Sequence, residues 1–342
     1  MKKTPIVLLT LMLLGSTPLF AQGSSGVSKR GTTAAPFLSI AQGARALGIG
    51  GAFVAIADDP SAMYWNPSGI AELQGFHLMV DHTYWFADIQ YNYVGATMSL
   101  GSYGALGVNL TASDIGQMNV TTVDQQDGTG EVFTVSDLAV GVSYALQLTD
   151  KFSIGFNPKF VYQKIWKMSA SAIALDLGVK YRTPFEGVML GMSITNFGTK
   201  MQMAGNNALV LYDSDPGNTG HNTRVPAELA MESWDLPLNF RVGIAYDVPM
   251  GGLGKMTLAV DAAHPSDNYE SVNIGGEYVF DDFVYLRGGL KSLFQKDSEE
   301  SFTAGFGIKQ AVVGNFQIMV DYTYQDLKRL KNAQKITLGV AF

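Results

Sequence analysis

Hydrophobic and polar residues alternate along most of the chain after residue 75, which is the period-two pattern of a β-strand. In one such segment Phe240, Val242 and Ile244 share a face, while Arg241 and Gly243 lie on the other. The pattern predicts fourteen strands, at residues 76–86, 89–100, 103–113, 132–148, 151–166, 170–182, 187–197, 237–248, 254–264, 269–280, 282–292, 300–311, 314–325 and 332–342.

The polar face of these predicted strands carries charged residues. A soluble sandwich turns its apolar face inward and its polar face to water. A membrane barrel turns its apolar face to lipid and encloses the polar one in its lumen. Alternation alone leaves both architectures open, so other features must decide between them. The charges on the polar face are Asp176, Lys180, Arg241, Asp247, Glu277, Arg287, Lys309 and Asp321.

The connections between the strands alternate in length. Successive hairpins of a membrane barrel close on opposite sides, with short turns in the periplasm and longer loops outside. The strand number is even and most strands reach the ~9–11 residues needed to cross a bilayer at a tilt. The last residue, Phe342, ends an alternating strand and resembles the signal read by the barrel-insertion machinery. Short connections occur at 101–102, 149–150, 183–186, 249–253, 281–282 and 312–314, and mostly longer ones at 114–131, 198–236, 265–268, 293–299 and 326–331, although those at 87–88 and 167–169 are also short.

The composition and the N-terminus favour the membrane barrel. Hydrophobic residues make up 47% of the 342 residues and charged residues 15%, below the ~25% usual for soluble domains. Residues 1–21 begin with Lys2 and Lys3, continue with an apolar stretch and end at Ala21, as a cleavable secretory signal does. A buried N-terminal helix is the alternative for this segment. We therefore predict an all-β fold, a transmembrane antiparallel β-barrel of about 14 strands in the cell outer membrane, in contact with its lipid.

Candidate chemistry is sparse in this sequence. The chain has no cysteine and a formal net charge of −7, which excludes thiolate metal sites and argues against nucleic acid as a partner. No nucleophile, base and acid can be assembled into a catalytic site. We expect a protein that is not an enzyme and that has no cofactor or metal. The four histidines, His77, His82, His221 and His264, are scattered.

Residues 34–75 form a segment of different character, which follows a flexible leader at 22–33 and precedes the barrel at 76–342. Its glycines lack the spacing of a phosphate-binding loop and indicate tight backbone packing instead. Asp58-Asp59 predicts a turn or helix cap, with carboxylates that could face Arg45, Arg241 or Arg287. The predicted structural residues of this segment are Arg45, Gly48, Gly50, Gly51, Asp58, Asp59, Asn66, Pro67 and Gly69.

Residues 198–236 form the longest predicted loop, and long loops on a rigid scaffold often carry binding sites. Tyr212 and Trp234 are its candidate partner-binding residues. Trp85, Phe86 and Trp166 lie at outer strand ends, where we expect an interfacial aromatic belt.

The segment 31–73 contains the motifs ARALG at 44–48, GGA at 50–52, ADD at 57–59 and YWNPSG at 64–69. It resembles the N-terminal signature of the PorV/PorQ family of outer-membrane proteins, relatives of the FadL long-chain fatty-acid transporters. The strand LPLNFRVGIAY at 236–246 also resembles a family strand. The resemblance implies a FadL-like barrel with residues 34–75 packed inside as a hatch.

For function, the resemblance implies docking or shuttling of secreted cargo, by its C-terminal signal domain, in type IX secretion. Cargo signal domains and type IX translocon components would then be partners. The alternative is a FadL-like transporter of hydrophobic small molecules. An apolar pocket that opens sideways through the wall would favour the transporter, whereas a lumen filled with charged side chains would disfavour it.

Overall fold

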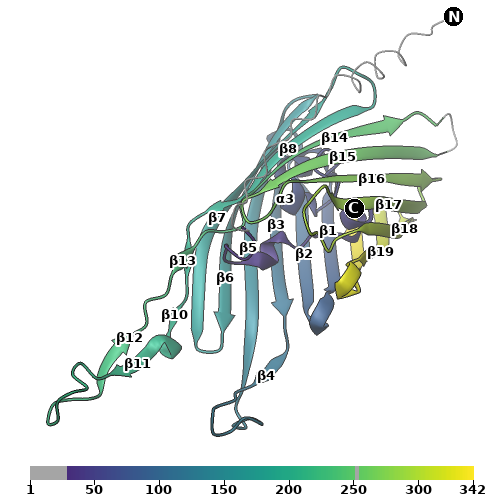
Figure 1. Ribbon diagram of the computed structural model, residues 1–342. Coiled ribbons are helices and arrows are strands. Elements are labelled where there is room, and N and C mark those ends of the chain that lie inside the picture. Colours follow the sequence, from purple (N-terminus) through teal and green to yellow (C-terminus); the bar gives the residue numbers. More distant parts are fainter. Residues whose placement is uncertain (1–28, 251–253) are drawn as a thin grey trace, which may run out of the picture.

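The chain forms a closed antiparallel β-barrel (Figure 1), seen here in a computed structural model that describes residues 29–250 and 254–342. The predicted signal peptide lies outside the described residues, as does most of the predicted leader. Each barrel strand pairs with its neighbours in sequence, and β1 pairs with β20 to close the wall. The fourteen strands are β1 (Phe76–Tyr84), β2 (Gln90–Ser99), β3 (Ala105–Asp114), β5 (Val132–Thr149), β6 (Phe152–Ile165), β7 (Met168–Arg182), β8 (Val188–Gly198), β14 (Asn239–Val248), β15 (Lys255–Pro265), β16 (Ser271–Phe280), β17 (Val284–Leu293), β18 (Phe302–Val313), β19 (Phe316–Asp326) and β20 (Asn332–Ala341).

The predicted strand number is confirmed, and the strands lie within a few residues of the predicted ranges. At the closing seam the backbone N–H of Phe76 donates to the carbonyl of Phe342 at 2.8 Å, and the reverse bond measures 3.0 Å. The aromatic C-terminus therefore completes the barrel wall beside the first strand. Phe76 and Phe342 lie at the rim of the barrel that contains the tight turns, which we call the short-turn end. We call the opposite rim the long-loop end.

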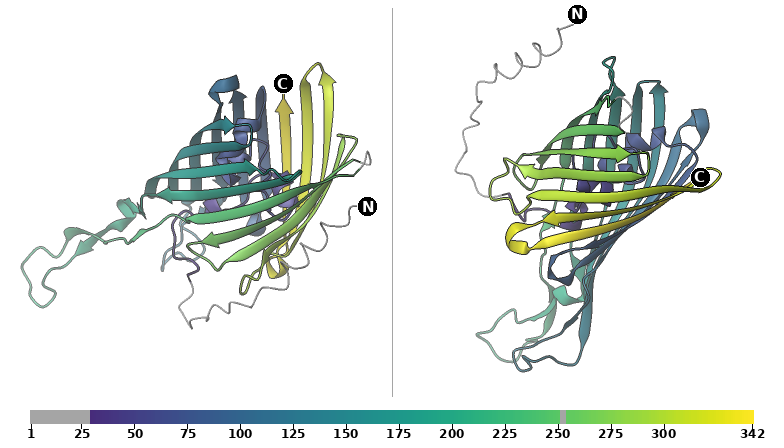
Figure 2. Two further views of the ribbon diagram at one scale, coloured as in Figure 1. Left: turned by 90° about the horizontal axis from the view of Figure 1, so that it is seen from above. Right: turned by 90° about the vertical axis from the view of Figure 1, so that its right-hand side faces the viewer.

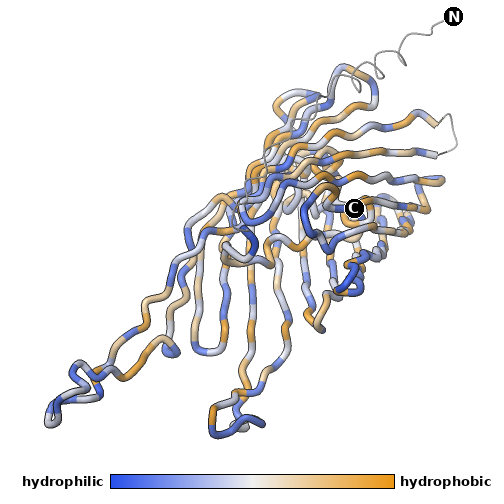
Figure 3. Tube along the Cα trace, viewed as in Figure 1, coloured by the Kyte–Doolittle hydropathy of each residue, from blue (hydrophilic) through white to orange (hydrophobic). Residues whose placement is uncertain are grey.

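The two faces of the wall differ as a membrane barrel requires. Phe240, Ile244 and Val320 point outward with 42%, 47% and 46% of their surface exposed. Lys180 and Asp321 point inward and keep only 2% and 1%. Figure 3 shows the resulting alternation of apolar and polar residues along the strands. A soluble sandwich would bury the apolar face, so that architecture is excluded. The described part of the chain contains no helix long and apolar enough to cross a membrane.

Residues 34–75 lie inside the barrel (Figure 2) as a hatch of short helices. Ala46, Phe53 and Ile70 are fully buried in the core that the hatch forms with the inner wall. Within the hatch, α2 (Ala44–Gly48) packs on β17–β20 and η2 (Pro67–Glu72) packs on β5–β7. The hatch helices are η1 (Pro36–Ser39), α2 (Ala44–Gly48), α3 (Ala62–Trp65) and η2 (Pro67–Glu72).

The connection between β8 and β14 is not the plain loop predicted for 198–236. It contains the hairpin β11 (Leu209–Tyr212) and β12 (Val225–Glu228), which projects well beyond the barrel rim (Figure 1). The run LVLY at 209–212 is apolar enough to have indicated a strand. The remaining small elements are η3 (Phe86–Asp88), η4 (Gly101–Tyr103), β4 (Gln117–Asn119), β9 (Met201–Gln202), β10 (Ala204–Gly205), η5 (Asn206–Ala208), β13 (Ser233–Trp234) and η6 (Lys328–Leu330).

Candidate functional site

A charged network joins the hatch to strands β16–β19. Arg45 in α2 donates from Nε to Glu277 Oε2 at 2.9 Å and pairs through Nη1 with Asp58 Oδ1 at 2.5 Å. Arg287 continues the network, with its Nε 2.6 Å from Glu277 Oε2 and its Nη1 2.5 Å from Asp321 Oδ1. Each buried carboxylate here has a cationic partner, as burial of charge requires.

Among the three arginines considered as partners for Asp58 and Asp59, the structure selects Arg45, itself a hatch residue. Its Nη1 lies 3.6 Å from Asp59 Oδ2. Neither Arg241 nor Arg287 pairs with these two carboxylates within the described residues. Partial loss of hydration would raise the pKa of Asp58, but the Arg45 guanidinium together with Lys180 holds that pKa below its usual value.

A second anchor joins the start of α2 to the closing seam of the barrel. Asp81 accepts hydrogen bonds from the backbone N–H of Gly43 at 3.2 Å and from Lys335 Nζ at 2.7 Å. The Thr337 hydroxyl accepts from the backbone N–H of Ala44 at 2.8 Å. Because Asp81 and Lys335 come from β1 and β20, this anchor ties the hatch to the first and the last strand of the barrel.

A third anchor holds the turn before η2 against β6 and β7. Asn66 is fully buried, and its Nδ2 donates to the carbonyls of Val54 at 2.8 Å and Val179 at 2.9 Å. Its Oδ1 accepts from the backbone N–H and the hydroxyl of Ser68, which fixes the turn opened by Pro67. Nearby, Asp59 Oδ1 accepts from the Ser61 backbone at 2.8 Å and starts α3.

Two hatch glycines stand where a side chain has no room. Gly50 has φ +71°, and a Cβ there would lie 2.9 Å from the wall carbonyls of Ile274 and Leu290. At Gly69 a Cβ would lie 1.9 Å from the Ala57 carbonyl. Gly48 faces Thr323 and Gly51 faces Trp65 in the same close packing. At Gly48 and Gly50 the hatch backbone therefore lies directly against the wall, whereas Gly51 and Gly69 pack against other parts of the hatch.

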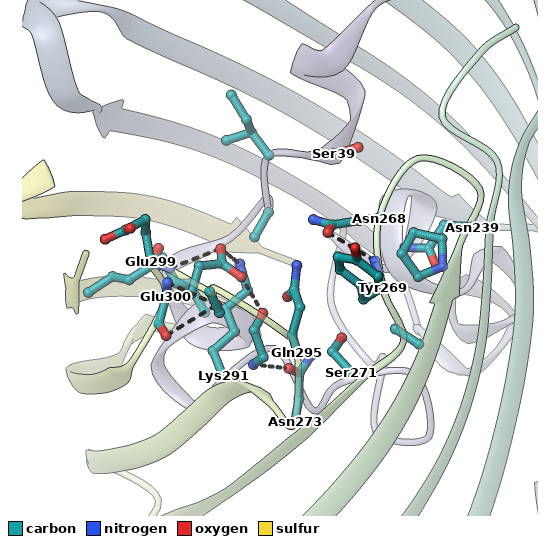
Figure 4. A pocket seen from close by; sticks show the side chains of 18 of the residues that line it. Ser39, Asn239, Asn268, Tyr269, Ser271, Asn273, Lys291, Gln295, Glu299 and Glu300 are labelled. Carbon is teal, nitrogen blue, oxygen red and sulfur yellow. Dashed lines mark hydrogen bonds and ion pairs between the residues drawn. The ribbon is translucent and has the colours of Figure 1, made fainter. Parts of the chain in front are cut away.

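A polar cavity of about 370 Å³ lies between the hatch and strands β14–β17 at the long-loop end (Figure 4). Asn239, Arg241 and Lys291 line it from the wall, and Trp65 lines it from the hatch. Trp85 also lines this cavity, so it is not the belt residue that its place at a strand end predicted. We call this space the loop-end cavity. The described residues contain no group of His, Cys, Asp or Glu that could hold a metal ion.

The two predicted partner-binding residues are both exposed but do not lie together. Tyr212 ends β11 in the projecting hairpin, with 57% of its surface exposed. Trp234, 48% exposed, belongs to β13 and pairs with Met201 in a separate two-stranded sheet. Sequence reasoning missed the apolar neighbours of Tyr212 on the hairpin, Leu209, Val210 and Leu211, which are exposed as well.

Comparison with known proteins bears on these features. The family model described as type IX secretion system protein PorV matches residues 25–183. The predicted PorV resemblance is confirmed. The match covers the hatch and the first strands, where the sequence motifs lie, and this PorV-like barrel is an outer-membrane protein. A search of curated proteins found no match.

Solved structures show the same fold as the PorV-like barrel at low sequence identity. The Ralstonia pickettii toluene transporter TbuX has a TM-score of 0.55 and 13% identity, covering 88% of this chain and 97% of its own. A Pseudomonas aeruginosa FadL homologue has a TM-score of 0.54 and 12% identity, covering 86% and 96%. The CymD monoaromatic hydrocarbon channel has a TM-score of 0.54 and 15% identity, covering 88% and 97%. These likenesses establish a FadL-like fold.

Proposed function

We propose that this PorV-like barrel docks secreted cargo proteins at its long-loop end during type IX secretion, with the projecting hairpin as the docking element. The observation that carries the proposal is an apolar two-stranded sheet held away from the barrel. Leu209 and Leu211 in β11 are 58% and 57% exposed, and Val225 in β12 is 38% exposed. Apolar residues gathered at an exposed site mark interaction surfaces.

The hairpin also offers the backbone for strand addition. β11 and β12 pair only with each other among the described residues, so each has a free edge. Pro226 in β12 has no N–H to donate, which leaves β11 as the better edge. An extended or β-rich signal domain could add a strand there and place apolar side chains on the exposed face.

Replacement of residues 209–228 by a short Gly-Ser linker in a type IX-competent strain tests this proposal. We expect cargo to accumulate in the periplasm while the barrel reaches the outer membrane at normal levels. The matched control shortens the β4 loop by removing residues 121–129, which lie at the same end of the barrel. Normal secretion without the hairpin would contradict the proposal.

Transport of a hydrophobic small molecule is the second candidate, and one pocket favours it. An apolar pocket of about 280 Å³ lies on the outer face of the wall between Phe240, Val272 and Phe294. It shares the wall residues Ala263 and Ser271 with the loop-end cavity inside. The charged anchors between hatch and wall oppose this reading, because an apolar solute would have to displace paired buried charges.

Uptake by proteoliposomes separates the two candidates. A transporter would accelerate entry of a monoaromatic hydrocarbon, and Ala262→Phe, which fills the outer pocket, would slow that entry. The docking proposal predicts no acceleration over empty liposomes. The same A262F substitution should leave cargo secretion unchanged.

A further inference from the structure

The loop-end cavity contains a buried cation that lacks an ion pair within residues 29–250 and 254–342. Four cationic residues line the cavity, and three have close partners. Lys291 Nζ lies 2.5 Å from Glu300 Oε1, and Lys335 Nζ lies 2.7 Å from Asp81 Oδ2. Arg30 donates to Asn268 and to backbone carbonyls of the 294–301 loop. Arg241 has no ion pair or hydrogen bond in the described part of the chain, although it is only 8% exposed.

Aromatic rings hold the Arg241 guanidinium in place. Its Cζ lies 5.4 Å from the ring centre of Tyr64 and 5.1 Å from that of Trp65. Trp65 is itself fixed, since its Nε1 donates to the Gln42 carbonyl at 2.8 Å. Cation–π contact compensates part of the cost of burying the charge but uses no N–H group. Asp261 attracts the guanidinium, yet forms no ion pair with it and instead accepts from the Val54 backbone at 2.9 Å.

We propose that the loop-end cavity binds a carboxylate, with Arg241 as its anchor. A planar guanidinium presents paired N–H donors that match the two oxygens of a carboxylate. A cavity of about 370 Å³ falls in the range of small-molecule sites, and aromatic side chains beside the cation can cover the apolar part of a ligand.

The 294–301 loop forms the roof of the cavity and restricts the chemistry of the ligand further. Asp297, Glu299 and Glu300 line it from the 294–301 loop, and their charges would repel a phosphate dianion more than a carboxylate. Two buried acceptors in this lining, Asn239 Oδ1 and Glu299 Oε2, have no donor among the described residues. A ligand with N–H or O–H groups next to its carboxylate would satisfy them. The fitting chemistry is therefore an amino-acid-like or hydroxy acid, either free or as the C-terminus of a polypeptide.

The inference does not depend on cargo docking, because binding can be measured on the purified mature barrel in detergent. The probes are N-acetyl-alanine and its uncharged amide, titrated while tryptophan fluorescence is followed, since Trp65 and Trp85 line the cavity. We expect saturable binding of the acid and at least roughly tenfold weaker binding of the amide, the loss of a charge-assisted hydrogen-bond pair. Equal binding of both probes, or no binding of the acid, would overturn the inference.

Variants assign the binding to Arg241. Arg241→Met keeps an apolar contact with the rings and should weaken acid binding roughly tenfold or more, and Arg241→Lys should restore part of the loss because it keeps the charge but not the fork. The control, Lys255→Met, removes an exposed cation at the short-turn end and should leave binding unchanged. An unchanged affinity in R241M would refute the assignment, and the acid–amide comparison still decides if that variant fails to fold.

Two further probes distinguish the source of the carboxylate. A short acetylated peptide with a free C-terminus is compared with its C-terminally amidated form. Binding of the capped amino acid as tightly as the free-acid peptide indicates a free small acid. Binding of the free-acid peptide that is at least tenfold tighter than binding of the capped amino acid indicates the C-terminus of a polypeptide. Both outcomes support the carboxylate site.

Discussion

The hatch interface and the projecting hairpin differ in which kinds of residue they bury and which they expose. In the hatch interface, charged and polar side chains such as Arg287 and Asn66 are buried and paired. In the hairpin, apolar side chains such as Leu211 are exposed and unpaired. A buried charge is held by its ionic partner, and removal of that partner strongly destabilises the fold. Substitutions in an exposed apolar strand change the stability of the fold little, but burial of that strand against a partner protein can stabilise a complex. The paired buried charges fix the hatch in the barrel, and the exposed apolar strand is the surface that we propose binds cargo.

The largest expected effect comes from Arg287→Met in the hatch network. The change leaves Asp321 buried without its cation and Glu277 with only Arg45. We expect a loss of about 3–5 kcal/mol in the free energy of unfolding, measured by denaturant titration in detergent micelles. Lys255→Met, which breaks an exposed pair with Asp247, should cost about 0–1 kcal/mol. Equal losses in the two variants would remove the distinction between buried and exposed charge.

A pair of wall glycines tests how closely the hatch is packed. A Cβ at Gly155 would lie 2.3 Å from the backbone of Pro67, whereas a Cβ at Gly288 on the outer face meets nothing within 4 Å. Gly155→Ala should therefore destabilise the barrel by about 1–3 kcal/mol. Gly288→Ala should be close to neutral, and thermal unfolding of both variants measures the difference. If G155A were also neutral, the hatch would be free to shift away from β6.

Acid should loosen the roof of the loop-end cavity. Burial would raise the pKa of Glu300, but Lys291 and the hydrogen bonds from Ser292 and Gln325 prevail and hold that pKa below its usual value. A lowered folded-state pKa means that this contribution to stability is complete above the ordinary value of 4.5 and is lost as the pH falls through the folded pKa. Hydrogen exchange in the 294–301 loop should rise over that range. Glu300→Gln should flatten the response, and an unaltered pH profile in E300Q would assign it to another group.

The smallest effect on stability is expected at the hairpin. Leu211→Asp changes an exposed side chain and should alter the free energy of unfolding by less than about 0.5 kcal/mol. Cargo capture by the purified barrel should nevertheless fall several-fold. Val123→Asp is the matched control, since Val123 is 89% exposed in the β4 loop. Equal loss of capture in both variants would indicate a general effect of charge at this end.

The alternation of residues by itself determined the strands and their two faces, whereas the composition, the N-terminus and the lengths of the connections favoured a membrane barrel over a soluble sandwich. A strand places successive side chains on opposite faces, so the period of two specified which residues meet lipid and which are enclosed, including Ile244 outside and Asp321 inside. Strand number and the two classes of connection follow from the same local rule. The hatch motifs predicted close backbone packing, because glycine and Asn-Pro favour particular backbone conformations wherever they stand in the chain.

Only the tertiary structure decided which charges meet. Arg45 and Glu277, or Asp81 and Lys335, are separated by more than two hundred residues and come together because the closed wall surrounds the hatch. The same closure turned Trp85 into a cavity residue and left Arg241 without an ion pair among the described residues. Local sequence specifies the direction of a side chain from its own strand, whereas its partner is set by barrel register and by the path of the hatch, to which distant parts of the chain contribute.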